Sequence, residues 1–294
     1  LHLSLRRQRQ MCIRDSFNPN QTVPEIVLPE IRPPDLKEFL KPTESIKFVW
    51  FGHSTLLINI QNTIILVDPV FSTSASPVNF IVPRFQPPVL ELNELPKIDV
   101  VLISHDHYDH LDMNTVQYLR DKVSKFIVPL GVTSHLKSWG VSEEKMIELD
   151  WWKSTSFDQV TFTSTPAQHF SGRQALFNIS QTLWSSWVVQ SADVSFYFSG
   201  DSGYDVHYKQ IGDKFGPIDL VFIDSGQYNA RWREVHNLPE EAVQASIDLK
   251  GRYLVPVHWL SLIHISEPTR QAEMSYGVLW VKKKRGGGGG GGGG

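Results

Sequence analysis

Cysteine is almost absent from this chain of 294 residues, which contains a single one, Cys12. One cysteine cannot form an intrachain disulfide or a thiolate-rich metal site, so histidine and carboxylate side chains must hold any bound metal. Long apolar runs are missing as well. Runs such as 64–67 and 100–103 are only four residues long, whereas a membrane-spanning helix needs about 20. Such runs are typical of buried strands.

The two ends of the sequence differ in kind from its middle. Residues 1–16 (LHLSLRRQRQMCIRDS) are basic and show no helix or strand period, and residues 261–294 finish in nine consecutive glycines. Both segments resemble translated sequencing-adapter read-through, and a pair of disordered tails is the alternative that composition allows. We therefore expect a Pro-rich extended arm over 17–45 and one domain over 46–260, with both ends outside the fold.

Basic residues are scarce once the two ends are set aside. The ends hold nine Lys or Arg and three Asp or Glu, so the 28 basic and 31 acidic residues of the whole chain fall to 19 and 28 for residues 17–260, a net charge of −9. An acidic surface argues against nucleic-acid binding, which needs a basic stripe. It does not argue against a small anionic substrate, because bound metal ions dominate the local field.

The alternation of short β-rich stretches and amphipathic stretches predicts an α+β fold. Strand-like runs come first, helices follow, and the second half repeats this style. That order fits two β-sheets packed face to face with helices on the outer faces, an αββα sandwich in one domain. The expected strands are 46–51, 55–60, 63–67, 98–104, 126–129, 145–149, 158–164, 183–190, 194–199, 218–224 and 252–257, and the expected helices are 114–125, 131–139, 205–215 and 239–250.

The densest cluster of reactive side chains is the segment SHDHYDHLD, residues 104–112, which directly follows an apolar run. Packing so many polar groups without partners would be costly, and neutral imidazoles and carboxylates are natural zinc ligands. The segment therefore predicts a metal site, with a solvated polar loop as the alternative. Its H-x-H-x-D-H spacing offers four candidate ligands, His105, His107, Asp109 and His110.

Three further candidate ligands occur in matching contexts, each after an apolar strand. They are His169 in TPAQH, Asp201 in SGDSG and His258 after YLVPV. A lone histidine at a strand end is usually a hydrogen-bonded scaffold residue. Loops gather at the strand ends of a sandwich, however, so several such positions favour a shared site with the 105–110 segment.

Together these motifs resemble the metallo-β-lactamase superfamily. Over residues 46–259 the sequence is similar more narrowly to the N-acyl-phosphatidylethanolamine-hydrolysing phospholipase D branch and its bacterial relatives. In that family further ordered structure follows the HW pair, whereas here Leu260 opens the segment set aside, so the last C-terminal elements of the fold are expected to be missing. The similar stretches are FGHSTLLI (51–58), VDPVFS (67–72), LISHDHYDHLD (102–112), TPAQH (165–169), SGDSGYD (199–205), IGDKFGPIDL (211–220), HNLPEEAV (236–243) and HW (258–259).

The resemblance implies a centre with two zinc ions. Two such ions can share a hydroxide that attacks a phosphorus or carbonyl atom, so no nucleophilic Ser or Cys is required. Flavodiiron-type relatives carry Glu at the position of His107, and an all-nitrogen first site favours zinc over redox iron. The implied ligands are His105, His107 and His169 on one ion, Asp109, His110 and His258 on the other, and Asp201 between them, with Asp109 and Asp201 acting in catalysis.

Residues around this centre have supporting or substrate-binding roles in the same interpretation. His53 is expected near the metals in a supporting role, and Asp106 and Asp112 either orient ligand imidazoles or are simple loop acids. The loop after the strand at 218–224 mixes polar donors with aromatic rings. We expect its residues Tyr228 and Trp232, together with His236, to bind substrate.

The leading functional hypothesis is a zinc-dependent phosphodiesterase of phospholipase D type that acts on N-acyl-phosphatidylethanolamine-like lipids. It implies a small-molecule or lipid-like substrate, peripheral contact with a membrane surface, no nucleic-acid partner and a cytoplasmic location. Two alternatives stay open. One is a lactone or sugar-lactone hydrolase, because a fold does not determine its substrate. The other is a zinc-binding scaffold without turnover.

Overall fold

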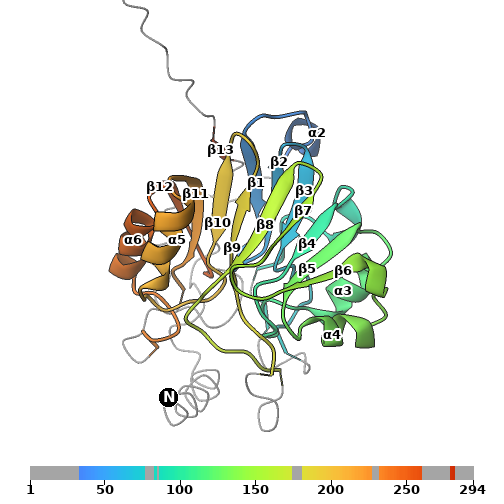
Figure 1. Ribbon diagram of the computed structural model, residues 1–294. Helices are drawn as coiled ribbons and strands as arrows, with labels where there is room; N and C mark the ends of the chain where they lie inside the picture. Colours follow the sequence, from blue (N-terminus) through green and yellow to red (C-terminus); the bar gives the residue numbers. More distant parts are fainter. Residues whose placement is uncertain are drawn as a thin grey trace, which may run out of the picture.

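The computed structural model describes residues 33–76, 83–84, 86–173, 181–226 and 232–259, together with the backbone of 279–281. In this part of the chain two mixed β-sheets lie face to face between outer helices (Figure 1). The αββα sandwich expected from the sequence is therefore confirmed.

The first sheet combines antiparallel and parallel strands. Its first part is an antiparallel meander, and its second part is parallel. The order across the sheet is β13 (Leu279–Val281), β1 (Ile46–Trp50), β2 (Leu56–Ile60), β3 (Thr63–Val67), β4 (Val100–Leu102), β5 (Lys125–Pro129) and β6 (Met146–Leu149).

The second sheet is built in the same mixed way. Its antiparallel part comes first in the chain, and its last three strands are parallel. The order across the sheet is β12 (Gly251–Val257), β11 (Ile218–Asp224), β10 (Ser195–Phe198), β9 (Ser186–Gln190), β8 (Val160–Thr165) and β7 (Ser154–Phe157).

Helices cover the outer face of each sheet (Figure 1). In the first layer, α3 (Met113–Leu119) and α4 (Thr133–Ser138) pack on the first sheet, and the short α2 (Leu36–Phe39) adds Phe39 to the same apolar cluster. In the other layer, α5 (His207–Phe215) and α6 (Pro239–Asp248) pack on the second sheet. Two single 3-10 turns, Leu92–Glu94 and Glu143–Lys145, complete the described helical elements.

The period-2 alternation of the strands produces three apolar layers. In β2, Leu56 and Ile58 point into the core between the sheets, while Leu57 points into the cluster beneath α3 and α4. In β10, Phe196 faces the central core and Tyr197 faces the cluster beneath α5 and α6. Because both faces of each sheet are covered, the strands are apolar on both sides, which explains their short continuous hydrophobic runs.

Several sequence-based boundaries differ from the structure. The strand expected at 158–164 is β8, but its hairpin partner β7, at 154–157, was not predicted because its sequence STSF is polar and half exposed. The expected helix 114–125 ends at Leu119. The described part of the predicted extended arm, 33–45, contains α2, whose first backbone amides are capped by Asp35. Finally, β13 lies within the C-terminal segment that was expected to stay outside the fold.

Candidate metal centre

Strand ends from both sheets supply the candidate site. His105 follows β4, His169 follows β8, and Asp201 follows β10. His258 follows β12, which is parallel to its neighbour β11, and β11 in turn is parallel to β10, so the three strands end at the same sheet edge. The backbone of His258 also donates to the carbonyl of His53 (2.8 Å), which joins the end of β12 to the turn between β1 and β2. The structure thus brings all seven predicted ligands to one place.

One group of donors consists of His105, His107, His169 and Asp201, whose ligand atoms all lie within 4.8 Å of one another. Nε2 of His105 is 2.9 Å from Nδ1 of His107, and Nε2 of His169 is 3.3 Å from the same Nδ1. Three imidazole nitrogens that converge in this way suit a cation that accepts their lone pairs.

A second group consists of His53, Asp109, His110 and His258. Oδ2 of Asp109 lies 3.0 Å from Nε2 of His53, 3.6 Å from Nε2 of His258 and 3.7 Å from Nε2 of His110. His53 therefore contacts the predicted ligands directly, in keeping with the supporting position expected for it. Its backbone and that of His258 are left-handed, with φ of 54° and 67°, a conformation that often marks functional sites.

Asp201 links the two groups. Its Oδ1 lies 3.1 Å from Nε2 of His110, and its Oδ2 lies 3.3 Å from Nε2 of His258. The same Oδ2 is 3.7 Å from Nε2 of His169 and 3.8 Å from Nε2 of His105. A single carboxylate therefore lies within reach of imidazoles from both groups, as expected for a ligand shared by two metal ions.

Several of these buried atoms lie close together without being aligned for hydrogen bonds. Among the described residues, Nε2 of His110, Oδ1 of Asp201 and both ring nitrogens of His258 have no hydrogen-bond partner. Leaving buried polar atoms unsatisfied is costly, and atoms aimed at a common point rather than at one another are typical of metal ligands. The donor set, with nitrogen and carboxylate oxygen and no thiolate, fits zinc.

The ionisation of the histidines also fits a cation site. Burial lowers the pKa of His105 and His169 well below the usual value, so their imidazoles are neutral and able to bind metal. Burial would lower the pKa of His258 too, but Asp201 and Asp224 raise it to about 10. Likewise the carboxylates of Asp201 and Asp109 outweigh burial and raise the pKa of His110 well above its usual value. The protons on His258 and His110 thus balance the negative charge of the nearby carboxylates, a charge that a bound metal ion would balance instead.

Two buried carboxylates that the sequence analysis did not assign contact Nδ1 of predicted ligand imidazoles. Asp68 lies 2.8 Å from Nδ1 of His110 and accepts hydrogen bonds from the backbone and hydroxyl of Ser104 (2.7 and 2.5 Å). Asp224 lies 2.8 Å from Nδ1 of His236 and 3.2 Å from Nδ1 of His258. Both follow or end apolar strands, β3 and β11, so the signal that found Asp201 could have found them.

Asp106 and Asp112 do not orient any predicted ligand. Asp112 caps α3 through the amide of Asn114 and also accepts from the amides of the 71–72 turn. Asp106 accepts from the amide of Gly172 (2.6 Å) and contacts Nε2 of His135 (3.2 Å). The loop-acid interpretation therefore describes both residues, which hold the 105–112 segment in shape.

The three predicted substrate residues have different outcomes. Tyr228 lies outside the described residues. Trp232 is buried, with 5% of its surface exposed, and its ring lies 6.2 Å from that of His236. The ring of His236 is stacked on that of His258 (5.0 Å, 12°) and meets that of His169 edge-on (5.3 Å). Of the three, His236 is placed directly against the predicted ligands.

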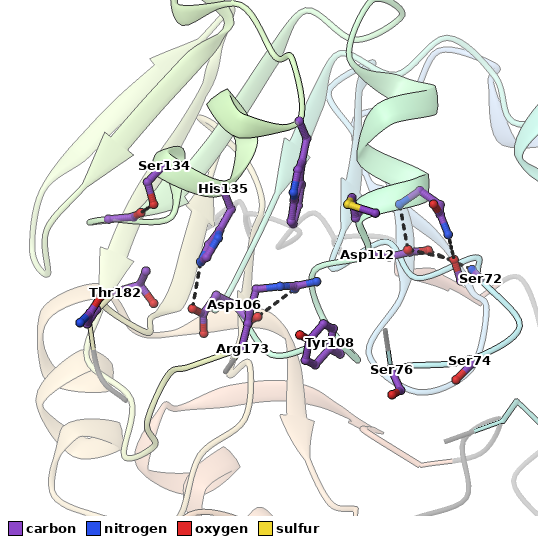
Figure 2. A pocket seen from close by; sticks show the side chains of 15 residues that line it. Ser72, Ser74, Ser76, Asp106, Tyr108, Asp112, Ser134, His135, Arg173 and Thr182 are labelled. Carbon is purple, nitrogen blue, oxygen red and sulfur yellow. Dashed lines mark hydrogen bonds and ion pairs between the residues drawn. The ribbon is translucent and has the colours of Figure 1, made fainter. Parts of the chain in front are cut away.

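A polar cavity of about 570 Å³ lies against the same loop (Figure 2). Asp106 and Tyr108 line it, while the neighbouring His105 and His107 belong to the metal-binding group. Arg173 crosses the cavity wall, donating from Nη1 to the carbonyls of Asp106 (3.0 Å) and Leu111 (2.5 Å). Hydroxyl groups contribute much of the remaining lining, from Ser72, Ser74, Ser76, Ser134 and Thr182.

No helix among the described residues has the length and apolarity needed to cross a bilayer.

Comparison with known families identifies a match over most of the domain. The sequence model described as "Beta-lactamase superfamily domain" matches residues 63–259. This range contains every predicted ligand from His105 to His258.

Curated relatives are similar over the same region. An uncharacterized protein from Mycobacterium tuberculosis is 46% identical over 215 residues, which cover 71% of this chain and 57% of that protein. The N-acyl-phosphatidylethanolamine-hydrolyzing phospholipase D 1 of Caenorhabditis elegans is 37% identical over 223 residues, 71% of this chain and 62% of that enzyme. The mitochondrial enzyme of that name from Saccharomyces cerevisiae is 31% identical, over 76% of this chain and 50% of its own length. The chain thus spans less than two thirds of each relative.

Solved structures share the fold at low sequence identity. An isothiocyanate hydrolase from Delia radicum gut bacteria aligns with a TM-score of 0.62 at 18% identity, over 76% of this chain and 88% of that chain. Igni18, a metallo hydrolase from Ignicoccus hospitalis, aligns with a TM-score of 0.57 at 19% identity, over 78% and 89% of the two chains. At such identities the likeness shows the fold alone.

Proposed function

This chain belongs to the metallo-β-lactamase superfamily, and on that premise we propose that it is a zinc-dependent hydrolase, in particular a phosphodiesterase of phospholipase D type. The observation that carries the proposal is the position of Asp201, which contacts imidazoles of both donor groups. A carboxylate that lies between two groups of imidazole and carboxylate donors is the arrangement that two-metal hydrolysis needs.

Zinc ions held by the two groups would supply Lewis acidity and a nucleophile derived from water near neutral pH. The protein side chains divide the remaining work. The side chain of Asp109 is 25% exposed, whereas that of Asp201 is 3% exposed. Asp109 is therefore the more accessible of the two carboxylates, and its contact with Nε2 of His53 holds it in place. Asp201, enclosed by imidazoles, fixes the spacing of the two groups.

The proposed substrate is an N-acyl-phosphatidylethanolamine-like lipid. The support is the similarity to the two phospholipase D relatives over most of this chain. Such a substrate would bring the protein into peripheral contact with a membrane surface, and His236, together with Tyr228 and Trp232, remains the proposed substrate-binding set. The net negative charge of the domain disfavours a nucleic-acid substrate.

A lactone hydrolase is the second candidate, and one observation favours it. The cavity beside the metal loop has hydroxyl, carboxylate, imidazole and guanidinium groups in its lining next to Met113 and Trp139, and such polar groups suit a small polar substrate better than an acyl chain (Figure 2).

The test is to purify the full chain without chelator, measure its zinc and iron content, and assay bis-p-nitrophenyl phosphate beside a panel of lactones. We expect about two zinc ions per chain and phosphodiester hydrolysis that chelation abolishes and zinc restores. Lactone turnover without phosphodiester turnover would transfer the proposal to the second candidate. Zinc without turnover of either class would leave a scaffold, and iron or no metal would remove the zinc assignment.

A further inference from the structure

The end of β11 places one carboxylate between two histidines of different proposed roles. Asp224 is completely buried, as is its strand. Its Oδ2 lies 2.8 Å from Nδ1 of His236, and its Oδ1 lies 3.2 Å from Nδ1 of His258. His236 is a proposed substrate residue and His258 a proposed zinc ligand, so both sides of the centre rest on the same carboxyl group.

Backbone hydrogen bonds hold the carboxyl group of Asp224 in place. The amides of Ser202 (3.2 Å) and Gly226 (3.1 Å) donate to its two oxygens, and its own amide donates to the hydroxyl of Ser199 (2.8 Å). The carboxylate is therefore hydrogen-bonded to the loop that carries Asp201 and to His236, and it makes an ion-pair contact with Nδ1 of His258.

A carboxylate only accepts hydrogen bonds, and this determines which ring nitrogens carry protons. Nδ1 of His236 must carry the hydrogen that points at Oδ2. Nδ1 of His258 lies 3.2 Å from Oδ1 in an ion-pair contact, and the negative charge there favours a proton on Nδ1 rather than on Nε2. In each neutral ring the lone pair is then on Nε2. For His258 this is the nitrogen that lies 3.3 Å from Asp201 and 3.6 Å from Asp109, where a metal ligand is needed.

We propose that Asp224 is a positioning residue that sets the tautomer of His236 and His258 together, so that both present Nε2 to the metal and substrate side of the cleft. This inference rests on the proposed function, because it assigns His258 to zinc and His236 to substrate. The two rings are stacked, with centroids 5.0 Å apart and planes 12° apart, so their Nδ1 atoms face the same carboxyl group.

The variant Asp224→Asn tests the proposal because it keeps the shape of the side chain. An amide offers one acceptor oxygen where the carboxylate offers two, so its NH₂ group must face one of the two Nδ1–H groups. That ring must then move its proton to Nε2 or turn away. We expect a loss of roughly 10–100-fold in zinc affinity, measured by competition with a chelator, since residues that hold a ligand imidazole typically contribute that much.

Asp219→Asn is the matched control. Asp219 is a nearly buried carboxylate at the opposite end of β11, where it accepts from the amide of Ser195 (3.0 Å) and from Arg252 (2.6 Å). This variant should lower the unfolding temperature to a similar degree while leaving zinc affinity and the pH profile of kcat/KM as in the wild type. An Asp224→Asn protein that binds zinc as tightly as the Asp219→Asn protein would overturn the proposal.

A second measurement needs neither the variant nor metal. In metal-free wild-type protein at mildly alkaline pH, long-range ¹H–¹⁵N correlations should show His236 as the Nδ1–H tautomer. An Nε2–H tautomer at His236 would overturn the proposal even if Asp224→Asn fails to fold. Failure of the proposed function would look different, because the wild type itself would then bind no zinc or show no hydrolysis while its His236 tautomer could still be read.

Discussion

Asp201 and His258 meet at 3.3 Å between Oδ2 and Nε2, although they follow strands β10 and β12, which are separated in the sheet by β11. The same carboxylate reaches Nε2 of His110 at 3.1 Å with its other oxygen. The contacts of Asp201 thus span both donor groups, and its removal should disturb both metal positions rather than one.

Asp201→Ala should lower zinc content from about two ions per chain to well below one. Hydrolysis should fall by more than the 10–100-fold that loss of a supporting residue typically costs. Elemental analysis and kcat/KM on a phosphodiester check both statements. The control is Asp205→Ala, an exposed carboxylate in the same loop region that contacts no donor of either group. Full occupancy in Asp201→Ala would contradict the shared-ligand assignment.

Gly226 is required by the close approach of the 224–226 backbone to His258. A Cβ atom at position 226 would lie 1.8 Å from the carbonyl oxygen and 2.6 Å from Nδ1 of His258. Gly226→Ala should therefore displace this imidazole, lower zinc affinity and destabilise the fold by roughly 1–3 kcal/mol, as overpacking usually does.

Gly212→Ala separates these two effects. Its Cβ would meet the backbone oxygen of Asp248 at 1.9 Å, where α5 packs against α6, away from the donor groups. We expect a comparable loss of stability with zinc affinity unchanged, as measured by chemical unfolding and chelator competition. Equal zinc affinity in the two variants would show that the Gly226 contact does not position His258.

Much of the fold was predictable because both sheets are covered on both faces. Strands such as β2, β3 and β11 are mostly apolar, so their positions follow from composition alone. β7 has no such run, since its residues alternate between exposed and half-buried. The turn that follows it is marked only by the left-handed backbone of Asp158, with φ of 50°. Short polar strands of this kind depend on their partner strand more than on their own sequence.

The candidate site was predictable in part, because polar residues that follow buried apolar strands stand out in the sequence. Histidines and aspartates after buried strands, such as His169 and Asp201, stand out because polar groups there need partners. Asp224 has the same context, so its position could have been recognised, but its particular contacts with His236 and His258 appear only in three dimensions. Trp232 illustrates the converse, because its loop position favoured a substrate-binding role and the structure buries its side chain.

His207 makes the free energy of unfolding depend on pH in a way that a single substitution can isolate. Burial lowers its pKa from the ordinary 6.5 to about 4, and its Nε2 lies 3.2 Å from the hydroxyl of Ser202. The proton therefore binds the unfolded chain more tightly than the folded one. The corresponding stability is complete above pH 6.5 and is lost as the pH falls from 6.5 through 4, to a total of about 3 kcal/mol.

The variant His207→Gln should lose this slope, because a glutamine keeps a polar contact with Ser202 but does not titrate. The measurement is the free energy of unfolding by urea at several pH values, with chelator present in both proteins. The other histidines titrate equally in both, so the difference between the two curves isolates His207. Parallel curves between pH 6.5 and 4 would contradict the assignment.

The last prediction concerns the substrate and decides between the two candidate functions. A phosphodiesterase that acts on N-acyl lipids must bury part of the acyl chain, and each buried methylene contributes roughly 0.8 kcal/mol. Its kcat/KM should therefore climb several-fold per methylene across a short-to-long acyl series until the apolar surface is full. The polar cavity beside the 105–110 loop offers no such gain, because its hydroxyl and charged groups would be desolvated without partners (Figure 2). A climbing series therefore requires an acyl site elsewhere, and the segment around Tyr228 and Trp232 is where we expect it. A flat series, with turnover of small lactones, would keep the metal centre and remove the lipid.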